Sequence, residues 1–225
     1  MIHVRTRIER PDPALVEGLA RYSSATIHEA QGRKGALNSD IKPVDRSMSF
    51  CGPAVTVVCA PQDNLMLQVG IHYAQYGDVL VVSAGEYREA GTFGDVLGTA
   101  MHSKGLAAMV TDSGVRDTAD LIELGLPVFS RSICIKGTVK ETLGPINHPV
   151  VFGGQLVEPG DIVRGDADGV VLVKAADARW VIDACAEREA SEDDLRQKYR
   201  AGGTTIELLC NLVEKLAAKG LLVEE

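Results

Sequence analysis

The chain has 225 residues and a formal net charge of −8, with 45% hydrophobic, 24% charged and only 4% aromatic residues. A chain of this length buries enough surface to fold without disulfides or a structural metal, and its acidic balance disfavours direct binding to nucleic acid. It contains no apolar leader segment and no apolar run long enough to span a bilayer, so we expect a cytoplasmic protein that does not enter the membrane.

The first half of the chain alternates predicted helices with predicted strands. The helices are bounded by capping residues and glycines, as where Asp12 precedes Pro13 at the first helix start. The strands are short apolar runs of the kind that is buried on both faces. We predict helices at 13–22, 25–32, 63–77, 95–104 and 118–125, and strands at 54–60, 78–85 and 106–113. This alternation predicts parallel strand pairing and an α/β fold.

The second half of the chain has a different sequence pattern. After Pro127, short β-like segments at 127–132, 150–157, 161–165 and 169–174 are separated by Gly, Pro and Asp. We predict that they form a β-rich portion, with a second sheet packed on the first. From Ala176 the sequence is helical nearly to its end, with a break at 201–205. The expected organisation is a core over 1–175 and a helical C-terminal arm over 176–225.

Arg116 and Asp117 stand at a turn between the predicted strand 106–113 and the predicted helix 118–125. A carboxylate near a helix N-terminus is favoured by the helix dipole, whereas a cation there is disfavoured. Neighbours in sequence do not face each other on a helix, so a salt bridge between the two residues is not expected. The position of Arg116 therefore indicates a ligand.

A second turn precedes Asp95. Gly91 and Gly94 allow the backbone to approach a ligand closely, and the start of the helix at 95–104 presents free N–H groups. Such a place binds a carboxylate or a phosphate. The pattern is neither a P-loop nor a dinucleotide-binding G-x-G-x-x-G motif. Taken alone, this turn is explained better by a loop followed by an Asp-capped helix.

The two turns together suggest one site. Ligands of parallel α/β folds collect at the carboxyl ends of neighbouring strands, which would bring Asp95, Arg116 and Asp117 to one crevice. Two carboxylates with water suit Mg²⁺ or Mn²⁺, and Arg116 can hold the oxygens of an acid. A cation and an arginine together stabilise an enolate. Two capped helices and a surface arginine remain the alternative. The five histidines and five cysteines are too scattered to suggest a zinc or iron site.

The spacing of Asp95 and Arg116-Asp117 matches the D-x20-R-D signature of the class II pyruvate aldolases. These are the 4-hydroxy-4-methyl-2-oxoglutarate and 4-carboxy-4-hydroxy-2-oxoadipate aldolases, which share their fold with the regulator of ribonuclease activity A. The similarity extends to the blocks HEAQGR (28–33), GPAVTV (52–57), GDVLVV (77–82), GTVKETLGPIN (137–147), GGQLVEPGDIV (153–163) and DADGVVLV (166–173). The first and fourth blocks most resemble the carboxy-hydroxy-oxoadipate branch.

The resemblance implies a layered fold of the swivelling β/β/α type and trimers or hexamers with active sites between subunits. It implies that Asp117 binds Mg²⁺ or Mn²⁺ directly, that Asp95 holds water molecules of that ion, and that Arg116 binds pyruvate and stabilises its enolate. Glu192 is expected to reach the metal site of a neighbouring subunit, on which the arm packs. The residues implied to bind the pyruvyl group, in addition to Arg116, are Gly94, Asp95, Val96 and Leu97.

The implied function is metal-dependent retro-aldol cleavage of 4-carboxy-4-hydroxy-2-oxoadipate or 4-hydroxy-4-methyl-2-oxoglutarate to pyruvate and a 2-oxo acid, with oxaloacetate decarboxylation as a second activity. Beyond Gly202 the sequence departs from the usual family pattern, which leaves the natural substrate open. One alternative is a non-catalytic regulator that binds a ribonuclease or helicase. Another is a decarboxylase or hydrolase of a different 2-oxo acid. Lysine Schiff-base catalysis is disfavoured here, because no lysine lies near the predicted crevice in sequence.

Overall fold

The structure is a computed structural model that describes residues 3–209 and 211–221. Its centre is a seven-stranded mixed sheet in the order β1-β7-β5-β3-β2-β11-β12. The strands are β1 (Lys42–Pro43), β2 (Phe50–Val58), β3 (Val79–Ser83), β5 (Ala108–Thr111), β7 (Val128–Ser130), β11 (Ile162–Asp166) and β12 (Gly169–Val173). Strands β2, β3, β5 and β7 run parallel to one another, as the alternating pattern predicted.

Most of the late β segments join the main sheet, so the predicted second sheet packed on the first is confirmed only for the segment 150–157. Strand β7 lies beside β5, and the β11–β12 hairpin continues the main sheet antiparallel to β2. Strand β3 pairs with only one edge of β2, and the hairpin occupies the other edge, where Ile162 pairs with Pro53. Only β9 (Val150–Phe152) and β10 (Gln155–Val157) form a separate two-stranded hairpin.

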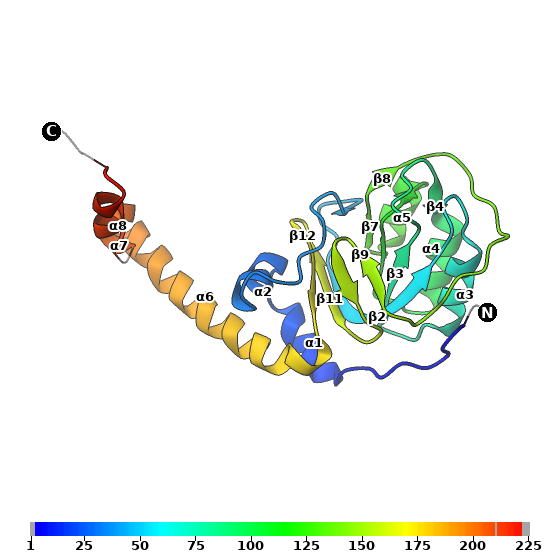
Figure 1. Cartoon of the computed structure of the whole chain (residues 1–225), viewed down its shortest axis with the longest axis horizontal. Coiled ribbons are helices and arrows are strands. Elements are labelled where there is room, and N and C mark those ends of the chain that lie inside the picture. The colour runs from blue at the N-terminus through cyan, green and yellow to red at the C-terminus, as the bar shows by residue number, and fades with distance from the viewer. Residues whose placement is uncertain (1–2, 210, 222–225) are drawn as a thin grey trace.

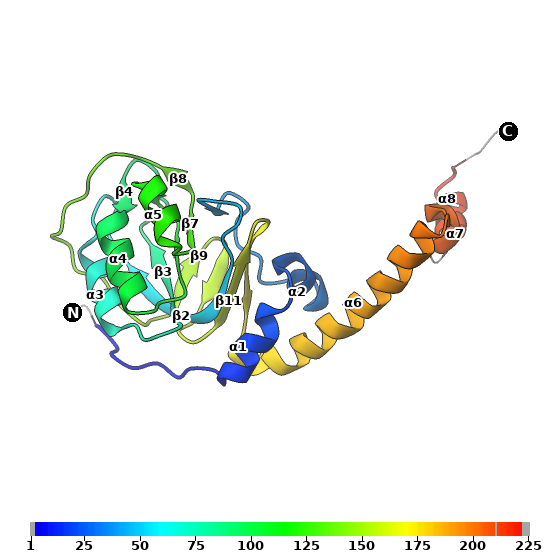
Figure 2. The same cartoon turned by 180° about the vertical axis from the view of Figure 1, so that it is seen from behind.

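Helices cover one face of the main sheet. They are α1 (Pro13–Ala20), α2 (Ser24–Ala30), α3 (Leu65–Tyr73), α4 (Asp95–Ser103), α5 (Thr118–Leu124) and α6 (Ala178–Arg200), with a short 3₁₀ turn at Ala175–Asp177. Figure 2 shows α3, α4 and α5 side by side in front of the sheet, whereas α1 and α2 lie at its β11–β12 end. The first helix begins as predicted, because the Asp12 side chain accepts the N–H of Ala14 at 2.9 Å.

Strand alternation explains the layering. On β3, Leu80 and Val82 pack against α3, α4 and α5, while Val79 and Val81 point to the opposite face. That face is covered by the β9–β10 hairpin through Phe152. Because both faces are covered, the central strands carry continuous apolar runs. The structure therefore confirms the α/β class and the layered packing of the core.

The arm begins inside the core. Ala178, Val181 and Cys185 on the first turns of α6 are buried against α1, α2 and the β11–β12 hairpin. Beyond them α6 leads away from the domain, and α7 (Thr205–Leu208) and α8 (Leu212–Ala218) follow the predicted break (Figure 1). Cys210 and residues 222–225 lie outside the described residues. That the arm packs on a neighbouring subunit stays a prediction.

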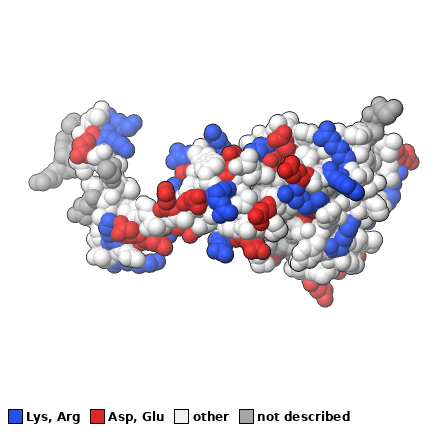
Figure 3. Space-filling view, turned by 90° about the horizontal axis from the view of Figure 1, so that it is seen from below, with Lys and Arg blue, Asp and Glu red and all other residues white. Residues whose placement is uncertain are grey.

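The charged residues in the outer part of α6 form a solvated face with several ion pairs. Glu192 bridges Arg188 and Arg196 at 2.7 Å each, and Lys198 pairs with Asp194 at 2.5 Å. Positive and negative side chains are also interspersed on the face of the molecule drawn in Figure 3. None of the described helices is long and apolar enough to cross a membrane.

A second, three-stranded parallel sheet was not predicted. It consists of β4 (Gly91–Phe93), β6 (Gly114–Val115) and β8 (Ser132–Ile133) in the order β4-β6-β8. Each strand is too short to show a hydrophobic period. This small sheet carries both of the turns that the sequence singled out.

Candidate active site

The small sheet brings the two predicted turns together. Strand β4 pairs in parallel with β6, with Phe93 opposite Val115, so both strands end at the same edge. The Arg116 backbone N–H donates to the carbonyl of Phe93 at 2.9 Å. Strands β3 and β5 are parallel neighbours, as expected. The strands that directly precede the turns, however, are β4 and β6.

Arg116 and Asp117 contact each other, contrary to the expectation for sequence neighbours. The Arg116 Nε lies 3.3 Å from Asp117 Oδ2. Asp117 has left-handed backbone angles, φ 52° and ψ 42°, and makes no capping hydrogen bond to α5. Its side chain therefore turns back toward Arg116 instead of following the helix. Non-glycine residues in this region cost conformational energy and are enriched at functional sites.

Asp95 joins this pair through its main chain. The Asp95 backbone N–H donates to Asp117 Oδ2 at 3.4 Å. The residue before it, Gly94, has no side chain with which to cap α4, so the first N–H groups of the helix are available to an anion. The side chains of Arg116 and Asp117 are 44% and 34% exposed. The structure thus brings Asp95, Arg116 and Asp117 together where a ligand can reach them.

A pocket of about 270 Å³ opens beside these residues, a size that suits a small organic acid. All of the residues predicted to bind the pyruvyl group line it: Gly94, Asp95, Val96, Leu97 and Arg116. Asp117 borders the pocket through its contacts with Arg116 and Asp95. Gly91 and Thr92 of the same predicted turn also line it. The remaining lining residues were not predicted, and they are Asn64, Gln68 and Lys140.

The argument that no lysine lies near the predicted crevice was wrong, because Lys140 lines the pocket. It reaches the pocket from the loop after β8, is exposed, and has no hydrogen bond or ion pair to its Nζ within the part of the chain that the structure describes. The block at 137–147 contains this residue, so the family resemblance was the signal that could have found it. Distance in sequence was therefore a poor reason to discount Schiff-base catalysis.

Buried hydrogen bonds support the floor of the pocket. Thr92 Oγ1 on β4 and Ser113 Oγ, just before β6, are 2.8 Å apart. Just before Ser113, the Asp112 carboxylate accepts the N–H of Ala84 at 2.6 Å and the hydroxyl of Ser83 at 3.0 Å. Burial raises the pKa of Asp112 against these hydrogen bonds. These contacts fix the loop between β3 and β4, and with it the position of the glycine turn.

The donor set at the pocket fits magnesium better than zinc. Among residues 3–209 and 211–221, no three His, Cys, Asp or Glu side chains converge on a point that could hold a metal ion. Asp95 and Asp117 supply two carboxylates from adjoining turns. Mg²⁺ is commonly held by one or two carboxylates together with water and substrate oxygens, whereas structural zinc sites use several His or Cys ligands.

Glu192 of the same chain does not reach the pocket. It lies on α6, beyond the buried first turns of that helix. The outer part of α6 leads away from the core, on the side opposite α4 and α5 (Figures 1 and 2). Its carboxylate is held by Arg188 and Arg196. A role in a neighbouring subunit's site stays a prediction.

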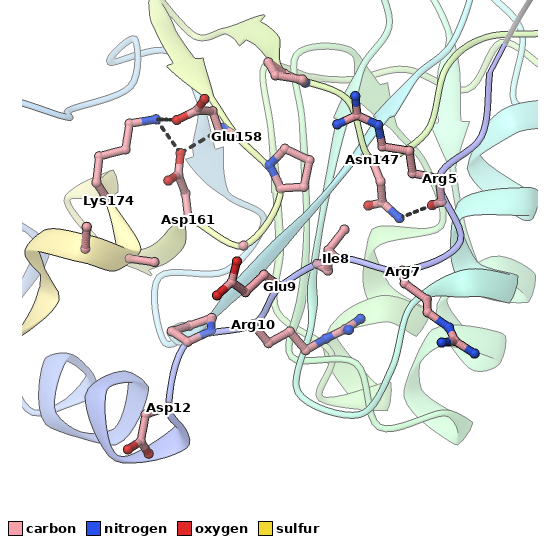
Figure 4. A pocket seen from close by; sticks show the side chains of 16 residues that line it. Arg5, Arg7, Ile8, Glu9, Arg10, Asp12, Asn147, Glu158, Asp161 and Lys174 are labelled. Carbon is pink, nitrogen blue, oxygen red and sulfur yellow. Dashed lines mark hydrogen bonds and ion pairs between the residues drawn. The ribbon is translucent and has the colours of Figure 1, made fainter.

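A larger cavity of about 770 Å³ lies between the N-terminal segment and the loops before β11 and α6 (Figure 4). It contains none of the predicted site residues. Several of its charges satisfy one another: Lys174 contacts Asp161 at 2.7 Å and Glu158 at 3.1 Å, and Arg10 pairs with Asp78 outside the cavity. The smaller pocket is therefore the candidate active site.

The structure is a mixed α/β core in which Arg116 and Asp117 contact each other beside a small pocket at the start of α4. The chain belongs to the RraA-like family, whose model, described as Aldolase/RraA, matches residues 24–172. This confirms the resemblance seen in the sequence.

Similar proteins support this assignment. A protein of Halalkalibacterium halodurans named "Putative 4-hydroxy-4-methyl-2-oxoglutarate aldolase" is 35% identical over 163 residues, which cover 72% of this chain and 77% of that protein. The crystal structure of Streptomyces coelicolor RraAS2, described as an unusual member of the RNase ES inhibitor RraA protein family, is 33% identical with a TM-score of 0.74, covering 84% of this chain and 99% of that one. An uncharacterized protein from Pseudomonas syringae, 22% identical, shares the fold with a TM-score of 0.81 over 90% of this chain and 95% of that one.

Proposed function

We propose that the chain is a divalent-metal-dependent carbon–carbon lyase that cleaves a 4-hydroxy-2-oxo diacid or triacid to pyruvate and a second 2-oxo acid. The preferred substrates are 4-carboxy-4-hydroxy-2-oxoadipate and 4-hydroxy-4-methyl-2-oxoglutarate. The observation that carries the proposal is the contact of Arg116 and Asp117 beside the uncapped start of α4. The name of the Halalkalibacterium halodurans relative points the same way.

Two groups of this chain bind the pyruvyl half of the substrate. The backbone N–H groups of Val96 and Leu97 at the start of α4 receive its carboxylate, because the helix dipole favours an anion there. Arg116 lines the same pocket and donates to the carboxylate and the 2-oxo oxygen. Asp117 holds the Arg116 guanidinium in place through the 3.3 Å contact.

Asp117 and Asp95 would hold the divalent cation. When bound, the ion supplies a Lewis acid beside the 2-oxo group. In the reaction the C4 hydroxyl loses its proton, the C3–C4 bond breaks, and C4 becomes a carbonyl. The electron pair of that bond moves to the enolate of pyruvate, whose oxygen Arg116 stabilises. C3 then takes up a proton and pyruvate leaves. Oxaloacetate decarboxylation forms the same enolate. We assign Glu192, supplied by a neighbouring copy of the chain, to the metal site.

Lys140 provides a second cation for the second carboxylate of the substrate. We expect Lys140→Ala to raise the KM for 4-hydroxy-2-oxoglutarate about tenfold or more, since a hydrogen bond to a charged group contributes about 1.5–3 kcal/mol. The matched substrate 4-hydroxy-2-oxopentanoate carries a methyl group in place of that carboxylate, and its KM stays unchanged. Steady-state kinetics on both substrates measure the effect. An equal change on both would contradict this role.

Gly94→Ala is expected to abolish most pyruvate release. A Cβ at Gly94 would lie 2.3 Å from Asp117 Oδ2 and 3.1 Å from Arg116 Cγ, so both side chains must move. A shift of about 1 Å at a reacting centre costs about 100-fold in rate. Gly137→Ala is the matched control, because its Cβ meets nothing within 4 Å. Wild-type turnover by Gly94→Ala would contradict the proposed geometry.

A coupled assay with lactate dehydrogenase tests the proposed function directly. It measures pyruvate released from the two preferred substrates and from oxaloacetate, with Mg²⁺ or Mn²⁺. We expect turnover of at least one hydroxy-oxo acid. A chain that releases pyruvate from none of these acids is not the proposed lyase. Turnover of only oxaloacetate or another 2-oxo acid would instead identify a decarboxylase or hydrolase acting in the same pocket.

A second candidate function rests on the similarity to RraAS2, which belongs to a family of RNase ES inhibitors. In that case the chain is a non-catalytic regulator that binds a ribonuclease or helicase. Affinity capture of such an enzyme, with inhibition of its RNA cleavage and no pyruvate released from any acid, would favour this function over the lyase.

A further inference from the structure

Asp63 ties the loop that carries Lys140 to the start of α3. Its side chain is buried, and Oδ2 accepts the backbone N–H groups of Glu141 at 2.9 Å and Thr142 at 2.8 Å. The other oxygen, Oδ1, accepts the N–H of Leu65 at 2.8 Å and caps the helix. A single carboxylate thus fixes the two residues that directly follow Lys140.

The next residue, Asn64, bonds both to the Lys140 loop, through its backbone N–H to the carbonyl of Val139 at 3.1 Å, and to the pyruvyl-binding turn. It occupies the N-cap position of α3 but makes no capping hydrogen bond with its side chain. Its Nδ2 instead donates to the carbonyl of Thr92 on β4 at 3.0 Å. Thr92 lies between Gly91 and Gly94 in the segment that forms the pyruvyl-binding turn. Two consecutive residues therefore connect one helix start to the Lys140 loop and to the pyruvyl-binding turn.

We propose that Asp63 is a positioning residue that sets the place of Lys140 at the pocket, and so makes the pocket selective for acids with a second carboxylate. Asn64 holds the pyruvyl-binding turn through its hydrogen bond to the Thr92 carbonyl. The inference rests on the proposed lyase function. It assigns to Asp63 a role in substrate choice, separate from the chemistry at Arg116.

The Asp63 carboxylate is ionised under assay conditions. Burial alone would raise its pKa, but the backbone N–H groups of Leu65, Glu141 and Thr142 outweigh burial and hold the pKa of Asp63 below its ordinary value. Asp63→Asn keeps the size of the side chain and replaces one acceptor oxygen with an NH₂ group. If the amide oxygen faces Leu65, the N–H groups of Glu141 and Thr142 lose their acceptor. If it faces the loop, those two N–H groups bond to a neutral oxygen in place of a carboxylate, which is a weaker bond, and Leu65 loses its acceptor.

The test compares wild type, Asp63→Asn, Lys140→Ala and the double variant on 4-hydroxy-2-oxoglutarate and 4-hydroxy-2-oxopentanoate. We expect Asp63→Asn to lower the diacid-to-monoacid ratio of kcat/KM about tenfold, through the KM of the diacid. The double variant should have the ratio of Lys140→Ala alone, because Asp63 acts through Lys140. Asn64→Ala, by contrast, should slow both substrates equally, since both share the pyruvyl group.

Two further measurements separate positioning from general destabilisation. Hydrogen exchange should rise in the segment 139–142 of Asp63→Asn and stay at the wild-type level around Arg116. Asp161→Asn is the matched control, because Asp161 is a buried carboxylate that accepts the backbone N–H of Glu158 at 2.8 Å beside the other cavity. It should leave the ratio unchanged. If Asp63→Asn does not fold, Asp63→Glu keeps the charge, displaces the same loop and gives the same readout.

The outcomes distinguish this inference from the function on which it rests. If the wild type turns over neither substrate, the proposed function is wrong, and so is this inference. An active wild type whose Asp63 variants lose both substrates equally shows that Asp63 only stabilises the fold. A double variant with a ratio below that of Lys140→Ala shows that Asp63 does not act through the lysine. Either of the last two results overturns the inference and leaves the lyase intact.

Discussion

Arg116→Ala is expected to lower the rate of pyruvate release about 100- to 1,000-fold, the loss typical when a donor to a developing oxyanion is removed. The guanidinium lines the pocket and lies against Asp117, where the enolate oxygen forms in the proposed reaction. Both kcat and kcat/KM should fall, because the interaction is strongest in the transition state. The coupled pyruvate assay on the preferred hydroxy-oxo acids measures the effect.

The Arg116 variant should stay folded. The side chain is 44% exposed, and an exposed ion pair contributes little to stability. Arg116→Lys is the informative companion, because it keeps the charge but loses the fork that binds two oxygens at once. We expect it to recover only part of the rate. If Arg116→Ala unfolds near the wild-type temperature and keeps the wild-type activity, Arg116 has no part in the mechanism.

Removing divalent metal with EDTA is expected to abolish pyruvate release, and added Mg²⁺ or Mn²⁺ should restore it. The physical reason is that two carboxylates at one pocket, Asp95 and Asp117, repel the acidic substrate unless a cation neutralises them. Asp117→Asn should weaken Mn²⁺ binding at least tenfold, measured by electron paramagnetic resonance of free Mn²⁺. Glu192→Gln should do so only if a neighbouring copy supplies that residue.

Lys140 makes a specific control necessary, because a lysine at the pocket permits Schiff-base chemistry. Lysines that form Schiff bases are usually desolvated in apolar pockets, whereas Lys140 is exposed. Borohydride in the presence of pyruvate should therefore add no mass to the protein. Full turnover in EDTA together with a pyruvate-derived adduct on Lys140 would replace the metal mechanism with the lysine one.

Local sequence patterns predicted most of the elements but not how they assemble. The N-cap at Asp12 and the glycines after the helices bounded the helices well, because these signals act within one turn. The place of β11 beside β2 depends on an edge that is distant in sequence. The strands β4, β6 and β8 are too short to show the hydrophobic period by which a strand is predicted. The small sheet that positions both turns could therefore not be predicted from the sequence.

The candidate site was predicted in part for the same reason. The arginine at a helix start and the glycine turn are local anomalies, so Asp95, Arg116 and the turn could be found. The left-handed backbone of Asp117, which creates its contact with Arg116, has no clear sequence signal. Lys140 is brought to the pocket by the buried bonds of Asp63 to the following backbone. That connection exists only in the folded chain.

The central claim is that Arg116, with a cation held at Asp95 and Asp117, stabilises the enolate of pyruvate. Exchange of the methyl protons of pyruvate in D₂O, followed by proton nuclear magnetic resonance, tests it without knowledge of the natural substrate. We predict that the wild type with Mg²⁺ catalyses the exchange and that Arg116→Ala or EDTA stops it. Exchange at the same rate in Arg116→Ala, or none in a folded, Mg²⁺-loaded wild type, would contradict the claim.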